Sequence, residues 1–195
     1  MRLIALLHGY GANGTDLLSL APHWQRDTDD VFIAPNAPDR TGGFGPGYEW
    51  FSLDGWMPGT PFTDHLPRIE AAEQQLKIKL KKELKDHGLS WKDLVLMGFS
   101  QGAIMALSVG LSEPEACAGI MAYSGAYLTP KPPLSKPDIL LVHGNADMVV
   151  NPNSFYEAKM DLENYDMPLT AKMIDGCGHW IDPAGLKAGK AFLSR

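Results

Sequence analysis

Short apolar runs recur along the chain without the alternation of apolar and polar residues that marks a half-exposed strand. The first run is "LIALL" at 3–7, and the others lie at 31–35, 93–98, 118–125, 138–144 and 169–175. Continuous apolar runs of this length are typical of strands that are buried on both faces of a parallel sheet. The pattern therefore predicts about six such strands.

Helical stretches separate these runs, and the clearest one spans 64–88. Its apolar residues recur at helical spacing: Ile69, Leu76, Leu80 and Leu84. Gly88 is a suitable residue to end this helix. Strands that alternate with helices predict a mostly parallel central sheet with helices on both faces. We assign residues 1–195 to a single α/β domain of this kind.

Lysines crowd the second half of this helix, at positions 77, 79, 81, 82 and 85. Acidic residues flank them and the net charge of the chain is −6, so we interpret them as a solvated helix face. The same charge argues against nucleic acid or an anionic membrane surface as a partner. No apolar run approaches the roughly 20 residues that span a bilayer, so stable membrane insertion is not expected. The two cysteines are too few for a disulfide framework and favour a cytoplasmic location.

The segment 36–63 interrupts the alternation, because its glycines and prolines leave no room for a long helix or strand. It also carries many large apolar side chains: Phe44, Tyr48, Trp50, Phe51, Trp56, Met57 and Phe62. A disordered linker would be poor in aromatic residues, so we predict an ordered binding loop or lid beside the functional site. The alternative is a satellite hydrophobic cluster that covers the edge of the sheet.

A candidate nucleophile follows the third predicted strand, in "GFSQG" at 98–102. Functional residues of a parallel sheet lie at the C-terminal ends of its strands. A serine at a sharp turn from strand to helix projects its hydroxyl there, beside the free N–H groups of the helix. Gly98 and Gly102 remove side chains that would collide with neighbouring segments. We therefore predict that Ser100 is a nucleophile rather than a helix-capping serine.

A serine hydroxyl needs a base, and His179 is the best candidate among six histidines. It lies in "GCGHW", a glycine-rich loop whose backbone freedom would let the imidazole reach the serine. His8 and His143 each end a strand before a glycine, where they are candidates for shaping their loops through hydrogen bonds. The remaining three lie in or beside helices and are expected at the surface: His23, His65 and His87.

The base in turn needs an acid that fixes its tautomer and stabilises the imidazolium. Asp147 directly follows a predicted strand and stands between Ser100 and His179, the chain order of hydrolases with this architecture. Asp138 begins that strand, at the opposite end of the sheet, and Asp175 is too close in sequence to His179. Two further aspartates lie on or after a helix: Asp161 and Asp166.

An oxyanion hole needs backbone N–H groups aimed at the charge of a tetrahedral intermediate. One is expected from Gln101, the residue after the nucleophile, and another from Tyr10 in "HGYGANG" after the first strand. The competing interpretation of this loop is a dinucleotide-binding turn. Its glycines match that register only in part, and no acidic residue ends the next strand, so we reject it.

A metal site is a further alternative near the predicted base. Cys177 and His179 lie two residues apart, with Asp175 and Asp182 nearby. The cluster lacks the paired-cysteine or His-x-x-x-His spacing of a zinc site. We therefore predict no metal and no cofactor.

Taken together, the motifs resemble the phospholipase/carboxylesterase family of the α/β-hydrolases, which includes the acyl-protein thioesterases. The matching segments span almost the whole chain in order: "LLHGYGANGTDLL", "APNAP", "YEWFSLDG", "GFSQGAIMALSVGL", "YSGAYL", "LLVHGNADMVV" and "GCGHWIDPAGLKAGKAFL". The resemblance implies the α/β-hydrolase fold and a catalytic triad of Ser100, Asp147 and His179. It also implies oxyanion amides from Tyr10 and Gln101.

The resemblance further implies that Trp50 and Phe51 border an acyl pocket, and we add Tyr10 and Met148 to the predicted substrate-binding residues. The chain departs from the family at Ser52, where "WFD" is usual, and at Tyr10, where leucine is frequent. Most members carry one or two strands before "HG", whereas only seven residues precede it here. We expect an N-terminally shortened sheet or an edge covered by a partner subunit in a homodimer.

These residues predict a serine hydrolase that cleaves carboxylic esters with short to medium acyl chains, or thioesters, through an acyl-enzyme intermediate on Ser100. The aromatic loop favours an acyl group of short to medium length over a charged substrate, and the expected partner is a small-molecule ester or thioester. One alternative is an acyl-protein thioesterase or lysophospholipase that acts on longer acyl chains. The other is a catalytically silent binding protein on a hydrolase scaffold.

Overall fold

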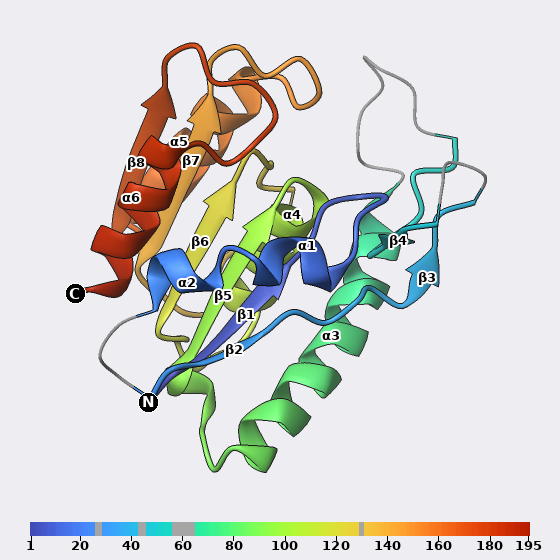
Figure 1. The fold of residues 1–195 in the computed structure, drawn as a ribbon, viewed down its shortest axis with the longest axis vertical. Helices are drawn as coiled ribbons and strands as arrows, with labels where there is room; N and C mark the ends of the chain where they lie inside the picture. The colour runs from blue at the N-terminus through green and yellow to red at the C-terminus, as the bar shows by residue number, and fades with distance from the viewer. Residues whose placement is uncertain (26–28, 43–45, 56–64, 129–130) are drawn as a thin grey trace.

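The computed structural model describes residues 1–25, 29–42, 46–55, 65–128 and 131–195 (Figure 1). Its centre is a sheet in the order β2-β1-β5-β6-β7-β8, in which every neighbouring pair is parallel. The strands are β1 (Leu3–Leu7), β2 (Val31–Ile33), β5 (Leu94–Phe99), β6 (Gly119–Tyr123), β7 (Ile139–Gly144) and β8 (Leu169–Ile174). These six described strands match the six predicted apolar runs.

Helices cover both faces of this sheet, as predicted (Figure 1). One face carries α1 (Gly14–Leu18), α2 (Ala21–Trp24) and α6 (Pro183–Leu193). The other carries α3 (Leu66–Asp86), α4 (Gln101–Leu111) and α5 (Asn153–Asn164). A 3-10 turn at Trp91–Asp93 leads into β5.

The sheet separates two apolar clusters, and β1 contributes to both of them. Ile4 and Leu6 pack with Trp24 of α2 and Phe192 of α6, whereas the other three residues of the strand, Leu3, Ala5 and Leu7, pack on the side of α3, α4 and α5. Every residue of β1 is therefore fully buried, which explains why its sequence shows no alternation. The edge strands β2 and β8 are only half-buried, so the prediction of complete burial is wrong for them.

The described part of the aromatic segment forms a short hairpin rather than a helix. It consists of β3 (Asp39–Arg40) and β4 (Tyr48–Glu49), which pair antiparallel. The amide of Gly11 donates to the carbonyl of Tyr48 at 3.0 Å, and the amide of Tyr48 donates to the carbonyl of Ala12 at 2.9 Å. The segment is thereby attached to the loop after β1. Four residues of the predicted aromatic set lie outside the described residues: Phe44, Trp56, Met57 and Phe62.

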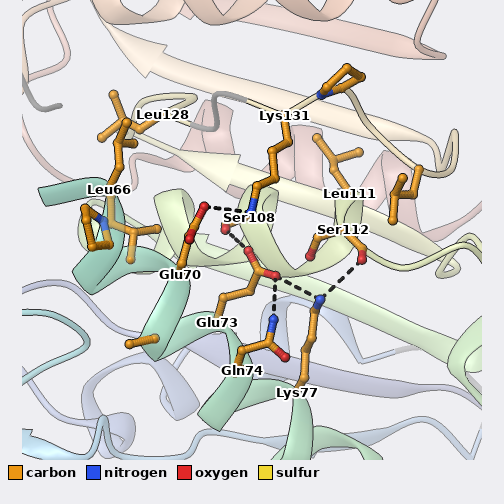
Figure 2. Close-up of a pocket in the computed structure, with 15 residues that line it drawn as sticks. Leu66, Glu70, Glu73, Gln74, Lys77, Ser108, Leu111, Ser112, Leu128 and Lys131 are labelled. Atoms are coloured by element: carbon orange, nitrogen blue, oxygen red, sulfur yellow. Dashed lines mark hydrogen bonds and ion pairs between the residues drawn. The ribbon is translucent and has the colours of Figure 1, made fainter.

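One lysine of α3 is not solvated as the sequence suggested. Lys77 is 7% exposed and lies between two carboxylates, 2.8 Å from Glu73 and 3.3 Å from Glu113. Its ammonium also donates to the carbonyl of Ser112 at 3.2 Å, and the hydroxyl of Ser108 donates to Glu73 at 2.5 Å. We call this set the α3–α4 charge cluster (Figure 2). It fixes the two helices against each other through groups that satisfy one another.

A cavity of ≈ 490 Å³ lies above this cluster, between α3, α4 and the segment that follows β6. Its apolar lining includes Leu66 and Leu128 at one end, whereas the charge cluster lies at the other end (Figure 2). At its rim, Lys131 forms an ion pair with Glu70 at 2.8 Å. The ionised side chains in this lining come in opposite-charge pairs. None of the described helices is long and apolar enough to cross a membrane.

Candidate active site

Ser100 stands alone between β5 and α4, in the strained backbone conformation that the strand-to-helix turn requires. Its φ is 56° and its ψ is −120°, a region that residues with a side chain rarely occupy. Its amide donates to the carbonyl of Tyr123 on β6 at 2.9 Å, which fixes the turn to the sheet. A Cβ on Gly98 would overlap the carbonyl of Gly102, and a Cβ on Gly102 would overlap that of Leu7. Both glycines are therefore needed for the turn to form.

His179 lies between Ser100 and Asp147 in a continuous hydrogen-bonded chain. Its Nε2 is 3.0 Å from the hydroxyl oxygen of Ser100, and its Nδ1 is 2.7 Å from Oδ2 of Asp147. A carboxylate only accepts hydrogen bonds, so Nδ1 carries the proton and Nε2 is left to accept from the serine hydroxyl. The structure thus brings together three residues that sequence analysis proposed from three separate strand ends.

The carboxylate of Asp147 is 3% exposed and is held on both oxygens. Oδ1 accepts from the amides of Val149 and Val150, each at 2.9 Å, and Oδ2 faces His179. Burial by itself would raise the pKa of Asp147, but the hydrogen bonds from His179 and from these amides outweigh it and hold the pKa below its ordinary value. The group is therefore an anion at neutral pH, as the stabilisation of an imidazolium requires.

Hydrogen bonds connect the loop that carries Asp147 to the loop that carries His179. The side chain of Asn145 accepts from the amide of Gly176 at 2.8 Å and donates to Asp175 at 2.6 Å. The amide of Ala146 donates to the carbonyl of Cys177 at 3.0 Å. The sequence suggested that backbone freedom lets the imidazole reach the serine, but hydrogen bonds to the neighbouring loop set its position instead.

The loop after β1 passes directly against the serine. A Cβ on Gly9 would lie 3.2 Å from Cβ of Ser100, so the adjacent Tyr10 belongs to the same edge of the sheet. His8 shapes this loop through hydrogen bonds. It is one of the two histidines for which the sequence suggested such a role. Its Nδ1 donates to the carbonyl of Gly9 at 2.7 Å, and its Nε2 accepts from the amide of Ala37 at 3.0 Å. Burial lowers the pKa of His8, which keeps the ring neutral in both contacts.

Gln101 contributes a side-chain function that sequence analysis missed. Its side chain accepts from the amide of Trp50 at 2.8 Å and donates to the carbonyl of Phe51 at 2.7 Å. The indole N–H of Trp50 donates to the carbonyl of His8 at 2.8 Å. We call the two hydrogen bonds of the Gln101 side chain the Gln101 clamp, which joins the start of α4 to the aromatic segment. No local signal reveals it, because its partners lie about fifty positions away in the sequence.

The predicted substrate-binding residues occupy different environments. Trp50 and Phe51 are 3% and 2% exposed and belong to the core. Met148 is 95% exposed at the turn after Asp147, and Tyr10 is half-buried. Their contact with a substrate stays a prediction.

Two other expectations concern histidine and metal. His65 is 4% exposed with Nδ1 3.2 Å from the carbonyl of Ser52, so the prediction of a surface position is wrong for it. The side chain lies under the aromatic segment, which the sequence pattern of α3 alone does not indicate. Within the part of the chain that the structure describes, no group of three or more His, Cys, Asp or Glu side chains has the arrangement of a metal site.

Comparison with known proteins decides the family of the chain. A family model described as phospholipase/carboxylesterase matches residues 1–195. The chain belongs to the phospholipase/carboxylesterase family. Among curated members, acyl-protein thioesterase 1 of Emericella nidulans is 30% identical over 218 residues, which cover 98% of this chain and 89% of that protein. Esterase YpfH of Escherichia coli is 25% identical, over 93% of this chain and 77% of that protein.

Two solved structures have a similar fold. The crystal structure of esterase PE8 has a TM-score of 0.91 and 38% identity, over 99% of this chain and 91% of that one. SOBER1 of Arabidopsis thaliana has a TM-score of 0.87 at 22% identity, over 100% and 98%, and supports the fold alone. The family resemblance and the α/β-hydrolase fold expected from the sequence are confirmed. This family member is a hydrolase enzyme.

Proposed function

We propose that this hydrolase cleaves carboxylic esters with short to medium acyl chains, or thioesters, through an acyl-enzyme intermediate on Ser100. The observation that carries the proposal is the hydrogen-bonded chain from the hydroxyl of Ser100 through His179 to Asp147. A helix-capping serine would need neither the base at 3.0 Å nor the ionised acid behind it. The strained backbone of Ser100 supports the same role, because strain of this kind is found at functional sites.

In the proposed first step, Nε2 of His179 accepts the hydroxyl proton while the oxygen of Ser100 attacks the substrate carbonyl. The carbonyl oxygen becomes an anion, which the amides of Tyr10 and Gln101 stabilise. Gln101 begins α4, so its N–H is among the donors that the helix leaves without an internal partner. His179 then gives its proton to the leaving alcohol or thiol, and the acyl group stays on Ser100.

In the second step, His179 accepts a proton from water, and the resulting hydroxide attacks the acyl carbonyl. Collapse of the intermediate breaks the bond to Ser100, whose oxygen recovers the proton from His179, and releases the carboxylic acid. Asp147 stays ionised in both steps and stabilises the imidazolium. The mechanism uses side chains and amides of this chain and requires no cofactor.

The substrate class is inferred from the relatives of the chain. The names of the relatives include an esterase and acyl-protein thioesterases, which motivates both ester and thioester substrates. An acyl-protein thioesterase or lysophospholipase activity on longer chains is the second candidate. A silent binding protein is disfavoured, because the proposed nucleophile, base and acid are all present and connected.

The test is substitution of Ser100 by alanine, with Ser108→Ala as the matched control on α4, the helix that Ser100 precedes. We expect Ser100→Ala to lower kcat for a p-nitrophenyl ester by about 10⁶-fold, because the proposed nucleophile is lost. Ser108→Ala should retain activity, since that hydroxyl serves only the α3–α4 charge cluster. A fluorophosphonate probe should label the wild type but not Ser100→Ala. Unchanged turnover by Ser100→Ala would refute the proposal, and a series of esters of increasing chain length would define the acyl preference.

Three further expectations stay predictions within this proposal. The segment 36–63 is interpreted as a loop or lid near the site, since its described part carries the Gln101 clamp. A homodimer is expected to cover β2, which lies at one edge of the central sheet among the described strands. The cytoplasmic location follows from the low number of cysteines.

A further inference from the structure

His143 is a buried histidine that the proposed mechanism does not use. It lies near the end of β7 and is 2% exposed. Its Nε2 is 3.0 Å from the carbonyl oxygen of Val150 and 3.4 Å from Oδ2 of Asp147. A carbonyl oxygen only accepts hydrogen bonds, so Nε2 must carry a proton. The N–H of this ring is therefore directed at the turn that holds the proposed catalytic acid.

We propose that His143 is a positioning residue for Asp147, whose carboxylate it orients toward His179 by sharing one N–H with Val150 and with Oδ2. The inference rests on the proposed function, because Asp147 acts there as the acid of the triad. The substrate does not contact His143 in this scheme. The residue acts only through the acid and the turn that carries it.

The contacts of Asp147 show what the additional donor does. Oδ1 is fixed by the amides of Val149 and Val150, which belong to the same turn as the carboxylate. Those two bonds orient the carboxylate within its turn, but they do not attach the turn to the sheet. His143 belongs to β7 and supplies that attachment at the carbonyl of Val150. It also approaches Oδ2, the oxygen that His179 contacts at 2.7 Å.

A neutral donor suits this position better than a charged one. Burial lowers the pKa of His143, the negative charge of Asp147 raises it, and the neighbouring His179 lowers it again. The net shift is downward, so the ring is neutral at neutral pH and donates without adding a positive charge. A lysine or a protonated histidine here would neutralise Asp147 and weaken its stabilisation of the imidazolium on His179. The ring of Phe155 on α5 packs edge-on against His143 and excludes water from this side.

Three variants separate positioning from simple support of the fold. His143→Gln places an amide nitrogen near the position of Nε2, whereas His143→Asn places one near Nδ1, and His143→Phe keeps a ring without a donor. We expect Asn and Phe to lower kcat about tenfold, as expected for the loss of a hydrogen bond to a charged group, with KM within about twofold. Gln should restore most of kcat.

The pH profile and the proton NMR spectrum provide readouts that a structural role would not change. Without the donor, Asp147 holds the imidazolium more tightly, so the acidic limb of kcat/KM should move to higher pH in Asn and Phe. The low-field resonance of the proton between His179 and Asp147 should shift in these two variants and stay in place in Gln. This resonance is observable without turnover, so it tests His143 even if Ser100→Ala refutes the proposed function. A Gln variant as impaired as Asn, or unshifted resonances in Asn and Phe, would overturn the inference.

Discussion

Among the buried carboxylates that the structure describes, those of Asp147 and Glu73 are paired in different ways. At the C-terminal edge of the sheet, Asp147 faces a histidine at 2.7 Å. Between α3 and α4, Glu73 faces Lys77 at 2.8 Å. The two distances are similar, and both carboxylates are buried. They differ in the partner, which is a base that gains and loses a proton in one region and a constant cation in the other.

This difference indicates why only one of the regions is suited to catalysis. The ammonium of Lys77 is paired with Glu73, Glu113 and a carbonyl, so its charge is balanced within the α3–α4 charge cluster. His179 has a carboxylate on one nitrogen and a hydroxyl on the other, so a proton can travel through it. Burial of a charge is common to structure and chemistry, whereas a titratable partner within reach of a nucleophile is not.

Within this comparison, the largest expected effect is the loss of activity when the charge of Asp147 is removed. In Asp147→Asn the amides of Val149 and Val150 keep the remaining oxygen, so an NH₂ group faces His179. That group demands the wrong tautomer of the imidazole, and we expect kcat to fall about 10⁴-fold. The measurement is steady-state hydrolysis of a p-nitrophenyl ester.

Glu73→Gln is the matched control for that substitution. It also replaces a buried carboxylate by its amide, but it lies in the α3–α4 charge cluster. We expect its kcat to stay within about twofold of the wild type, while its unfolding midpoint falls. A comparable loss of kcat in both variants would show that burial, rather than the histidine partner, separates the two regions.

The second effect is on stability and comes from removing the cation. Lys77→Met leaves Glu73 with an uncompensated buried charge, which we expect to lower the free energy of unfolding by about 3–5 kcal/mol. In a chain of this size the melting temperature should fall by about 10 °C, as measured by calorimetry or circular dichroism.

Lys82→Met provides the comparison on the same helix. Lys82 pairs with Asp86 at the surface, where both side chains are largely exposed, so we expect no measurable change in the melting temperature. If the two lysine variants melted at the same temperature, the α3–α4 charge cluster would not be the structural element that we describe.

The smallest effect distinguishes the regions by pH. Two buried histidines, His8 and His143, lie at the C-terminal edge of the sheet. Each has a pKa below the ordinary 6.5, mainly because burial disfavours the charged ring. As the pH falls, these histidines take up protons in the unfolded chain before they do so in the folded one. Their contribution to the free energy of unfolding is therefore complete above about pH 6.5 and is lost as the pH falls through the lower pKa of the folded state. Urea unfolding at about pH 7.5 and about pH 5.5 should show lower stability at the acidic value.

His8→Leu should reduce that pH dependence, although it lowers stability at both pH values. No histidine lines the cavity above the α3–α4 charge cluster in the part of the chain that is described. Variants of that cluster should therefore keep the pH dependence of the wild type. A pH dependence that is unchanged in His8→Leu would contradict the assignment.

The sequence was sufficient for the strands of the central sheet and for the order of the candidate site residues along the chain. Each strand of the central sheet was visible as an apolar run, and the strand ends that carry Ser100, Asp147 and His179 follow from parallel topology. The reason is physical, because strands buried on two faces must be apolar throughout and parallel strands end at a common edge. The order of the strands, and of the candidate site residues that follow them, was therefore visible in the local composition of the sequence.

Contacts between distant side chains were not predictable in the same way. Lys77 belongs to a run of lysines that looks solvated, and only the packing of α4 reveals that this one is buried. His65 also looked like a surface residue until the position of Ser52 was known. Neither residue carries a local signal, because the partner that changes its environment comes from another element.

The Gln101 clamp has one more consequence. It grips only main-chain atoms of positions 50 and 51, the amide of one and the carbonyl of the other. These two bonds do not depend on which side chains positions 50 and 51 carry. The side chains are held separately, by burial in the core and, for Trp50, by the indole bond to the carbonyl of His8. Ser100 and the helix that follows it are therefore joined to this segment by two kinds of contact, one made by the main chain and one made by side chains. Replacement of Trp50 would remove the indole bond and leave the hydrogen-bonding groups of the clamp in place.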